Sequence, residues 1–264
     1  MDYLVQDTSL AAVADAIRAK TGGADALAFP EGMVEAIVGI SGGGSGGNTD
    51  MEDLLVGGVG KESITEYSNE RVTVIRPYMF QEFGGLQAVD LPNVETVGTY
   101  AFNGCQKLPE IYLPKCKAVG ANSFQVCRAL EKANLPLAET IDSYAFSNNS
   151  KLYDVSAPLV TNIQRQGFYM CAALKKLDFH QLNTIAMYSF TNSSKFDTLI
   201  IRTENVCTLD NVNALTGTAI ANKTGYVYVP SALVDSYKAA TNWSTYADQI
   251  RAIEDYPEIT GGAT

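Results

Sequence analysis

Apolar residues between positions 78 and 211 recur with a period of 22 residues, and no gap is needed to keep them aligned. The clearest column is phenylalanine, and the positions 6, 9, 11 and 17 residues after it are almost all apolar. The six phenylalanines are Phe80, Phe102, Phe124, Phe146, Phe168 and Phe190. A fixed period in this range indicates a solenoid, because one such unit cannot bury its own apolar side and stacked units cover one another.

Each unit predicts one short strand and a second extended piece. Positions 9 to 11 after the phenylalanine read apolar, variable, apolar, and side chains alternate along a strand, so both apolar residues should point into the coil. A proline follows in the first four units and should end the strand, since it has no N–H for the ladder. These prolines are Pro92, Pro114, Pro136 and Pro158.

The second extended piece is expected around the column 17 residues after the phenylalanine. This column is Val97, Val119, Ile141, Ile163, Ile185 and Cys207. Strands of successive units should lie about 4.8 Å apart. At that spacing the phenylalanines should stack as an aromatic spine inside the coil.

The unit resembles the BspA-like leucine-rich repeat, whose consensus is L-x-x-(I/V)-x-L-P-x-x-x-x-(I/V)-x-x-x-(A/S)-F-x-x-C-x-x-L. Residues 119–130 show its second half in full, as Val-Gly-Ala-Asn-Ser-Phe-Gln-Val-Cys-Arg-Ala-Leu. The resemblance covers about half of the chain and implies a leucine-rich-repeat solenoid, mainly β with short helices and turns. This class is abundant in bacterial surface proteins and phage-borne binding proteins, and it predicts fold more strongly than function.

Residues 78–211 should therefore hold six repeats between two caps. Ile75 lies five residues before Phe80, the spacing found in the full repeats, so residues 51–77 are expected to form an N-terminal cap with a partial repeat. Such a cap would cover the first open edge of the solenoid.

The period fails after residue 211, and residues 212–258 are expected to form a C-terminal cap of strand and helix. Residues 226–230 copy the strand and proline of a repeat, and Ser231 can begin a helix that runs to about Ala240. Trp243, the only tryptophan, is interpreted as part of the core of this cap. Residues 259–264 are expected to be a flexible tail.

Residues 1–40 predict a small helical hairpin. A helix from Ser9 to Lys20 carries an apolar face at helical spacing, and a second helix begins near Pro30, which suits a first helical position. Two short helices bury too little to be stable alone, so residues 9–40 are expected to attach to a tail or baseplate protein or to associate with sister chains. The glycine-rich stretch at 41–50 reads as a flexible linker.

The first helix and the turn after it also resemble tail and host-binding structural proteins of phages and prophages of Gram-positive bacteria. The resemblance rests on the order Ala-Asp-Ala-Ile-Arg-Ala-Lys-Thr-Gly followed by Phe-Pro-Glu-Gly, within residues 9–33. A plain helical hairpin is the alternative.

Charge and hydropathy exclude several classes of protein. The net charge of −10 argues against nucleic acid as a partner, because a phosphate backbone needs a basic face. No apolar run approaches the roughly 18 residues of a membrane span. The first seven residues have no basic start and no apolar core, so no secretory signal is expected.

Neither the cysteines nor the histidine point to catalysis, a cofactor or a metal site. Cys105, Cys127 and Cys171 share one repeat position and are interpreted as small residues packed inside the coil rather than as a disulfide framework. A bridge between the first two on oxidation stays open. The single histidine, His180, stands where other units have proline, so an enzyme is not expected.

Candidate binding residues lie on the outward strand positions, 8 and 10 residues after the phenylalanine. The first column is Ala88, Glu110, Lys132, Asp154, Lys176 and Thr198; its alternating charges could serve register alone. The second column, which suits a sugar but also any solvated face, is Asp90, Tyr112, Asn134, Ser156, Asp178 and Ile200.

A further column two residues before the phenylalanine is rich in tyrosine, which is common in binding surfaces. It comprises Tyr78, Tyr100, Tyr144 and Tyr188, interrupted by Asn122 and Gln166. These tyrosines could bind a partner or pack along a corner of the coil, and the sequence does not separate the two.

We therefore expect a non-enzymatic binding protein of a phage or prophage tail, which contacts a host cell-surface glycan or protein through the solenoid. It would be assembled in the bacterial cytoplasm and located in the virion tail. The alternative is a bacterial leucine-rich-repeat adhesin or protein-interaction module at the cell surface, unrelated to phage, for which a signal peptide or wall anchor would be expected. A purely structural spacer is the third interpretation.

Overall fold

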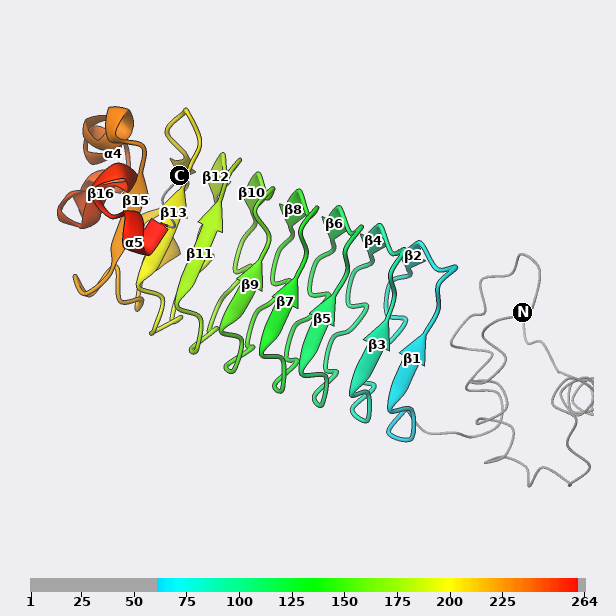
Figure 1. Cartoon of the computed structure of the whole chain (residues 1–264). Helices are drawn as coiled ribbons and strands as arrows, with labels where there is room; N and C mark the ends of the chain where they lie inside the picture. The colour runs from blue at the N-terminus through cyan, green and yellow to red at the C-terminus, as the bar shows by residue number, and fades with distance from the viewer. Residues whose placement is uncertain (1–60, 261–264) are drawn as a thin grey trace, which may run out of the picture.

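Each coil of the protein contributes two short parallel strands, and successive coils stack in a single row (Figure 1). The computed structural model describes residues 61–260. The predicted helical hairpin at 1–40, the linker at 41–50 and the first part of the N-terminal cap lie outside these residues.

The longer strand of each coil carries an odd number. These strands are β1 (Glu66–Ser68), β3 (Ala88–Asp90), β5 (Glu110–Tyr112), β7 (Lys132–Asn134), β9 (Asp154–Ser156), β11 (Lys176–Phe179), β13 (Thr198–Ile201) and β15 (Tyr226–Val229). We call their outward side the odd-strand face. Their hydrogen bonds form three sheets, β1-β3, β5-β7-β9 and β11-β13-β15-β16, the last with β16 (Ile250–Ala252).

The second extended piece of each coil is a two-residue strand, as predicted. These strands form one seven-stranded parallel sheet. They are β2 (Val74–Ile75), β4 (Thr96–Val97), β6 (Ala118–Val119), β8 (Thr140–Ile141), β10 (Asn162–Ile163), β12 (Thr184–Ile185) and β14 (Thr208–Leu209).

Within the repeats from β3 to β13, the odd-numbered strands that precede a proline are one residue shorter than those that do not. β3, β5, β7 and β9, which precede a proline, have three residues, whereas β11 and β13 have four. In the two longer units His180 and Arg202 occupy the proline position, and their main-chain N–H groups donate to Pro158 O and Phe179 O of the preceding coil. A proline could not make these bonds. In the C-terminal cap, β15 keeps four residues before Pro230, and its last residue, Val229, pairs with Ala252 of β16.

The predicted phenylalanine spine is present inside the coil. The six rings from Phe80 to Phe190 are fully buried, and neighbouring rings are parallel within 8° with centroids 4.8–5.6 Å apart. Tyr67 packs edge-on against Phe80 at 5.0 Å, and Phe196 stacks on Phe190 at 4.6 Å. Such contacts contribute about 0.5–1.5 kcal/mol per pair beyond area burial.

The predicted register is wrong in the sixth unit. Ile185 of β12 pairs with Leu209 rather than with Cys207, so this unit contains two extra residues. The cause is the C-terminal cap, which holds Cys207 by its main chain: Cys207 N–H donates to Tyr237 Oη at 2.8 Å, and Trp243 Nε1 donates to Cys207 O at 2.6 Å.

The C-terminal cap closes the last coil. It contains η1 (Val212–Leu215), β15, η2 (Ser231–Leu233), α4 (Val234–Ala239), η3 (Trp243–Gln249), β16, η4 (Ile253–Asp255) and α5 (Pro257–Thr260). Trp243 is buried and packs edge-on against Tyr237, with ring centroids 5.4 Å apart. Ile259, expected at the start of a flexible tail, instead belongs to α5.

Candidate binding face

The middle of the odd-strand face carries two aligned rows of exposed side chains. Parallel in-register pairing places Glu110, Lys132 and Asp154 side by side on β5, β7 and β9. The same pairing aligns the predicted binding residues Tyr112, Asn134 and Ser156.

These two rows line an open hollow of about 360 Å³, which we call the central groove. Its full lining is Glu110, Ile111, Tyr112, Lys132, Ala133, Asn134, Asp154 and Ser156. Tyr112 is 58% exposed. The groove therefore joins three of the predicted binding residues to a charged row for which the sequence left open a role in strand register alone.

The polar side chains of the central groove have no partners in the part of the chain that the structure describes. None of the side-chain hydrogen bonds or ion pairs found within residues 61–260 involves the side chain of Glu110, Lys132 or Asp154. The attraction expected between opposite charges on neighbouring strands is thus not realised as a contact within 4.0 Å. The ammonium group of Lys132 and the carboxylates of Glu110 and Asp154 on either side of it therefore stay available to a ligand.

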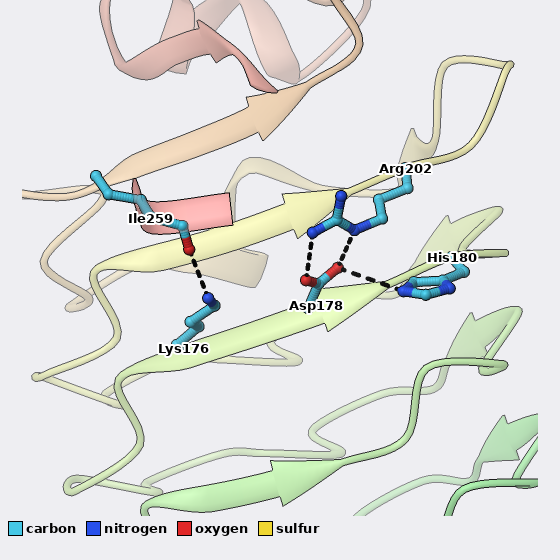
Figure 2. A network of polar contacts seen from close by, with 5 residues as sticks. All are labelled: Lys176, Asp178, His180, Arg202 and Ile259. Atoms are coloured by element: carbon cyan, nitrogen blue, oxygen red, sulfur yellow. Dashed lines mark hydrogen bonds and ion pairs between the residues drawn. The ribbon is translucent and has the colours of Figure 1, made fainter. Parts of the chain in front are cut away.

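The other three members of the predicted column, Asp90, Asp178 and Ile200, lie outside the groove. Asp90 is exposed on β3, where Ser68 Oγ approaches its Oδ2 at 3.5 Å. Asp178 of β11 accepts two hydrogen bonds from Arg202, at 2.8 Å from Nε and 2.7 Å from Nη2, and His180 Nε2 lies 3.9 Å away (Figure 2). The bonds to Asp178 raise the pKa of Arg202, so this carboxylate is already engaged.

The C-terminal end of the odd-strand face is covered by the chain itself, which corrects the expected outward column at Ile200. The side chain of Ile200 is fully buried, and Tyr228 on the next strand is 2% exposed. The segment from η4 to α5 lies over these strands (Figure 1), where Tyr256 packs edge-on against Tyr228 at 5.4 Å. Lys176 Nζ donates to the main-chain oxygen of Ile259 at 2.6 Å (Figure 2).

The predicted tyrosine column lies at a different corner, and none of its members lines the central groove. All of its residues have left-handed backbone conformations, with φ from 56° at Asn122 to 65° at Tyr78. The N–H groups of four of them, Tyr78, Tyr100, Asn122 and Tyr144, donate to the next coil, as Tyr100 does to Ala121 O at 2.9 Å. Every residue of this column therefore takes part in a left-handed turn. A bulky residue such as tyrosine is uncommon at positive φ.

Contacts within the tyrosine column are uneven. The rings of Tyr78 and Tyr100 stack at 5.4 Å with 8° between their planes, and the guanidinium of Arg165 lies 5.8 Å from the ring of Tyr188. Tyr78 is 55% exposed, and Tyr100, Tyr144 and Tyr188 are half-buried. The column therefore combines packing along the corner with an aromatic edge open to solvent.

All five cysteines are free and buried, and three of them donate hydrogen bonds to the phenylalanine spine. Cys105, Cys127 and Cys171 each donate from Sγ to the carbonyl of the spine phenylalanine in the preceding coil, at 3.0–3.1 Å. Asn149 Nδ2 and Ser193 Oγ make the same bond in two further units, at 2.8 and 2.7 Å, whereas the first unit has Phe83 here. This position thus holds a buried donor in five of the six units, a role that the interpretation as small residues missed.

The buried thiols are poor nucleophiles. Burial raises the pKa of Cys127 and of Cys171 to about 12 and that of Cys116 to about 11, and only the thiolate attacks. Within residues 61–260 there is no group of three or more His, Cys, Asp or Glu that could hold a metal ion. Over the same residues, no helix has the length and apolar character that crossing a membrane requires.

Comparison with known proteins agrees with this geometry. Residues 73–197 match the family described as BspA type leucine-rich repeat region, in six copies. No curated protein matches the chain significantly in sequence.

Two solved structures share the fold. One is a leucine-rich repeat protein from Bacteroides ovatus, with 19% identity and a TM-score of 0.52 over 72% of this chain and 54% of that one. The other is a leucine-rich repeat protein from Eubacterium ventriosum, with 24% identity and a TM-score of 0.51 over 60% and 44%. This chain thus spans about half the length of these proteins. Residues 61–260 therefore form a leucine-rich-repeat solenoid, within which residues 73–197 match the BspA type repeat in six copies.

Proposed function

We propose that this protein is a non-enzymatic binding protein that contacts its target through the odd-strand face. The observation that carries the proposal is the central groove, where six polar or aromatic side chains converge on one hollow without partners in the described chain. A solenoid commonly binds through the ladder of outward positions on one face.

The target that we propose is a host cell-surface glycan or protein, and the carrier is the tail of a phage or prophage. The support for the tail is the resemblance of residues 9–33 to tail and host-binding structural proteins of phages of Gram-positive bacteria. In this proposal residues 9–40 attach the protein to a tail or baseplate protein or to sister chains, and the solenoid reaches outward. The location is then the virion tail.

The second candidate is a bacterial leucine-rich-repeat adhesin or protein-interaction module at the cell surface. It is supported by the six BspA type repeats, because the resemblance of the repeat extends to bacterial surface proteins as well as to phage-borne ones. Both candidates use the same face, and they differ in what residues 1–40 do.

Binding of labelled full-length protein to a panel of Gram-positive bacteria, measured by flow cytometry, tests the proposed face. The double variant Tyr112→Ala/Asn134→Ala should lose most of the bound signal. The matched variant Tyr78→Ala/Asn122→Ala, with the same residue types in the tyrosine column, should retain it. Equal binding by the groove variant and the unaltered protein, with circular dichroism showing both folded, would remove the groove from the proposal.

A further inference from the structure

At the C-terminal end of the odd-strand face, polar side chains have hydrogen-bond partners within the chain. Lys176 of β11 donates to the main-chain oxygen of Ile259 at 2.6 Å, and Asp178 of the same strand accepts two hydrogen bonds from the guanidinium of Arg202 (Figure 2). A lysine on this face is therefore satisfied by a peptide carbonyl, and a carboxylate by an arginine.

Tyrosine on this face is also matched with an arginine. The guanidinium carbon of Arg251 on β16 lies 4.6 Å from the ring centroid of Tyr226 on β15. A guanidinium over a tyrosine face is attracted by the ring quadrupole and stacks on it. Three kinds of outward side chain thus have partners here: a main-chain carbonyl for lysine, and guanidinium groups for a carboxylate and a tyrosine.

The central groove presents the same three kinds of side chain without partners. Lys132 occupies the repeat position of Lys176, two coils earlier. Glu110 and Asp154 lie on the strands to either side of it, and Tyr112 is 58% exposed. No side chain of the described residues 61–260 contacts their charged groups by hydrogen bond or ion pair.

We propose that the central groove binds an arginine-containing segment of a partner polypeptide. One main-chain carbonyl of the segment accepts from Lys132, two guanidinium groups pair with Glu110 and Asp154, and Tyr112 packs on one of these guanidinium groups. Because they flank one intervening strand, the two carboxylates lie about 10 Å apart, and arginines two residues apart in an extended segment point to the same side and reach both with their long side chains. The inference rests on the proposed function, since it takes the odd-strand face as the binding face.

Charge favours this occupant over a neutral glycan. The chain carries a net charge of −10, which attracts a basic partner during diffusional approach. Arginine binds a carboxylate with two parallel N–H···O bonds and twice the strength of a neutral pair. A neutral sugar offers hydroxyl groups but no cation, so it would leave both carboxylates with uncompensated charge.

The test uses the full-length protein and the fluorescein-labelled peptide Gly-Arg-Gly-Arg-Gly, whose arginines are two residues apart and share one side of the extended chain, with fluorescence polarisation as the readout. At low ionic strength we expect saturable binding that Glu110→Gln/Asp154→Asn weakens at least tenfold and Lys132→Ala weakens severalfold. The control Glu95→Gln/Glu139→Gln makes the same change in net charge at exposed acids beside β4 and β8 and should bind within twofold of the unaltered protein.

Three results would overturn the inference: no saturable binding, no loss in the groove variant, or the same loss in the control variant. The failure of the inference and of the proposed function can be told apart. If Tyr112→Ala/Asn134→Ala abolishes cell binding while the peptide does not bind, the groove is a binding site for another ligand class, such as a glycan. If neither cells nor peptide respond to groove variants, both proposals fall.

Discussion

The thiol of Cys105 donates a hydrogen bond to the carbonyl of Phe80 in the preceding coil, with 3.1 Å between sulfur and oxygen. The spine phenylalanine thus contributes its ring to the stack and its carbonyl to a second, polar ladder. Because each coil contacts mainly its neighbours, this bond repeats along the solenoid with whichever donor the unit carries.

Asn149 is the member of this ladder that leaves a buried polar atom without a hydrogen bond within residues 61–260. Its Nδ2 donates to Phe124 O at 2.8 Å, but its Oδ1 is buried and has no partner in the described structure. Asn149→Cys keeps a donor and removes the unsatisfied acceptor, so it should stabilise the fold by about 1 kcal/mol. Thermal unfolding should show a Tm higher by about 2–4 °C.

The control for this change is Cys127→Ala, which removes the donor to Phe102 O and should lower the Tm. Cys127→Ser should lie closer to the unaltered protein, because Ser193 already serves as a donor at this position. A lower Tm for Asn149→Cys would show that the lost volume of the amide outweighs the unsatisfied oxygen.

Val126 is strained by the turn that it occupies. Its φ is 61°, whereas Asn148 and Asn192 hold the equivalent position in later units. A β-branched residue is an outlier in the left-handed region, and the cost of that region for residues with a Cβ is about 1–2 kcal/mol. Val126→Asn should therefore raise the free energy of unfolding by about 1 kcal/mol.

The reciprocal change, Asn148→Val, should lower the free energy of unfolding by a similar amount. Urea denaturation followed by circular dichroism measures both variants. If the two changes shifted the urea midpoint in the same direction, packing of the side chain rather than backbone strain would control this position.

Alkaline pH should destabilise the protein through its buried thiols. Burial raises the pKa of Cys127 and Cys171 from 9.0 to about 12, so the folded state holds these protons more tightly than the unfolded state does. The stabilisation is complete below pH 9 and is lost as the pH rises toward 12. Each pH unit within that window should cost about 1 kcal/mol per thiol.

Urea midpoints at pH 7, 9 and 10.5 measure this dependence. The triple variant Cys105→Ser/Cys127→Ser/Cys171→Ser should lose less stability between pH 9 and 10.5, since a serine hydroxyl does not ionise there. Parallel curves for the variant and the unaltered protein would assign the alkaline loss to other groups, such as Tyr237, whose pKa burial also raises.

The C-terminal segment should act as a cover for the odd-strand face. Deleting residues 256–264 removes Tyr256 and the carbonyl that Lys176 binds, and it should expose Ile200 and Tyr228. We expect a loss of about 2 kcal/mol for the exposed isoleucine and increased fluorescence of a hydrophobic dye. An unaltered Tm after this deletion would contradict a covering role.

The repeat pattern was readable from the chain because the contacts that it encodes are local. Phe102 contacts Phe80 and Phe124, each 22 residues away, so every stacking contact appears in the sequence as a period. Pro92 and its equivalents likewise end their strands through their own ring, without help from distant residues.

Features that depend on unrepeated contacts could not be predicted in this way. Cys207 follows the period in sequence but leaves it in space, because Tyr237 and Trp243 of the cap hold its main chain. Ile200 stands at an outward position of β13 but is buried, and α5, more than 50 residues further along the chain, lies over this end of the odd-strand face. No periodic signal connects such residues.

The sequence by itself determined the solenoid, its period, its aromatic spine and the set of outward residues. Each of these depends on contacts between neighbouring units, and the same contacts recur in every unit. Only the tertiary structure decided which outward residues form a site. Tyr112, Asn134 and Ser156 share the central groove with Glu110, Lys132 and Asp154, whereas Asp178 is paired with Arg202. The physical reason is that neither contact repeats along the chain: Arg202 stands where earlier units have proline, and the cover comes from the aperiodic C-terminal cap.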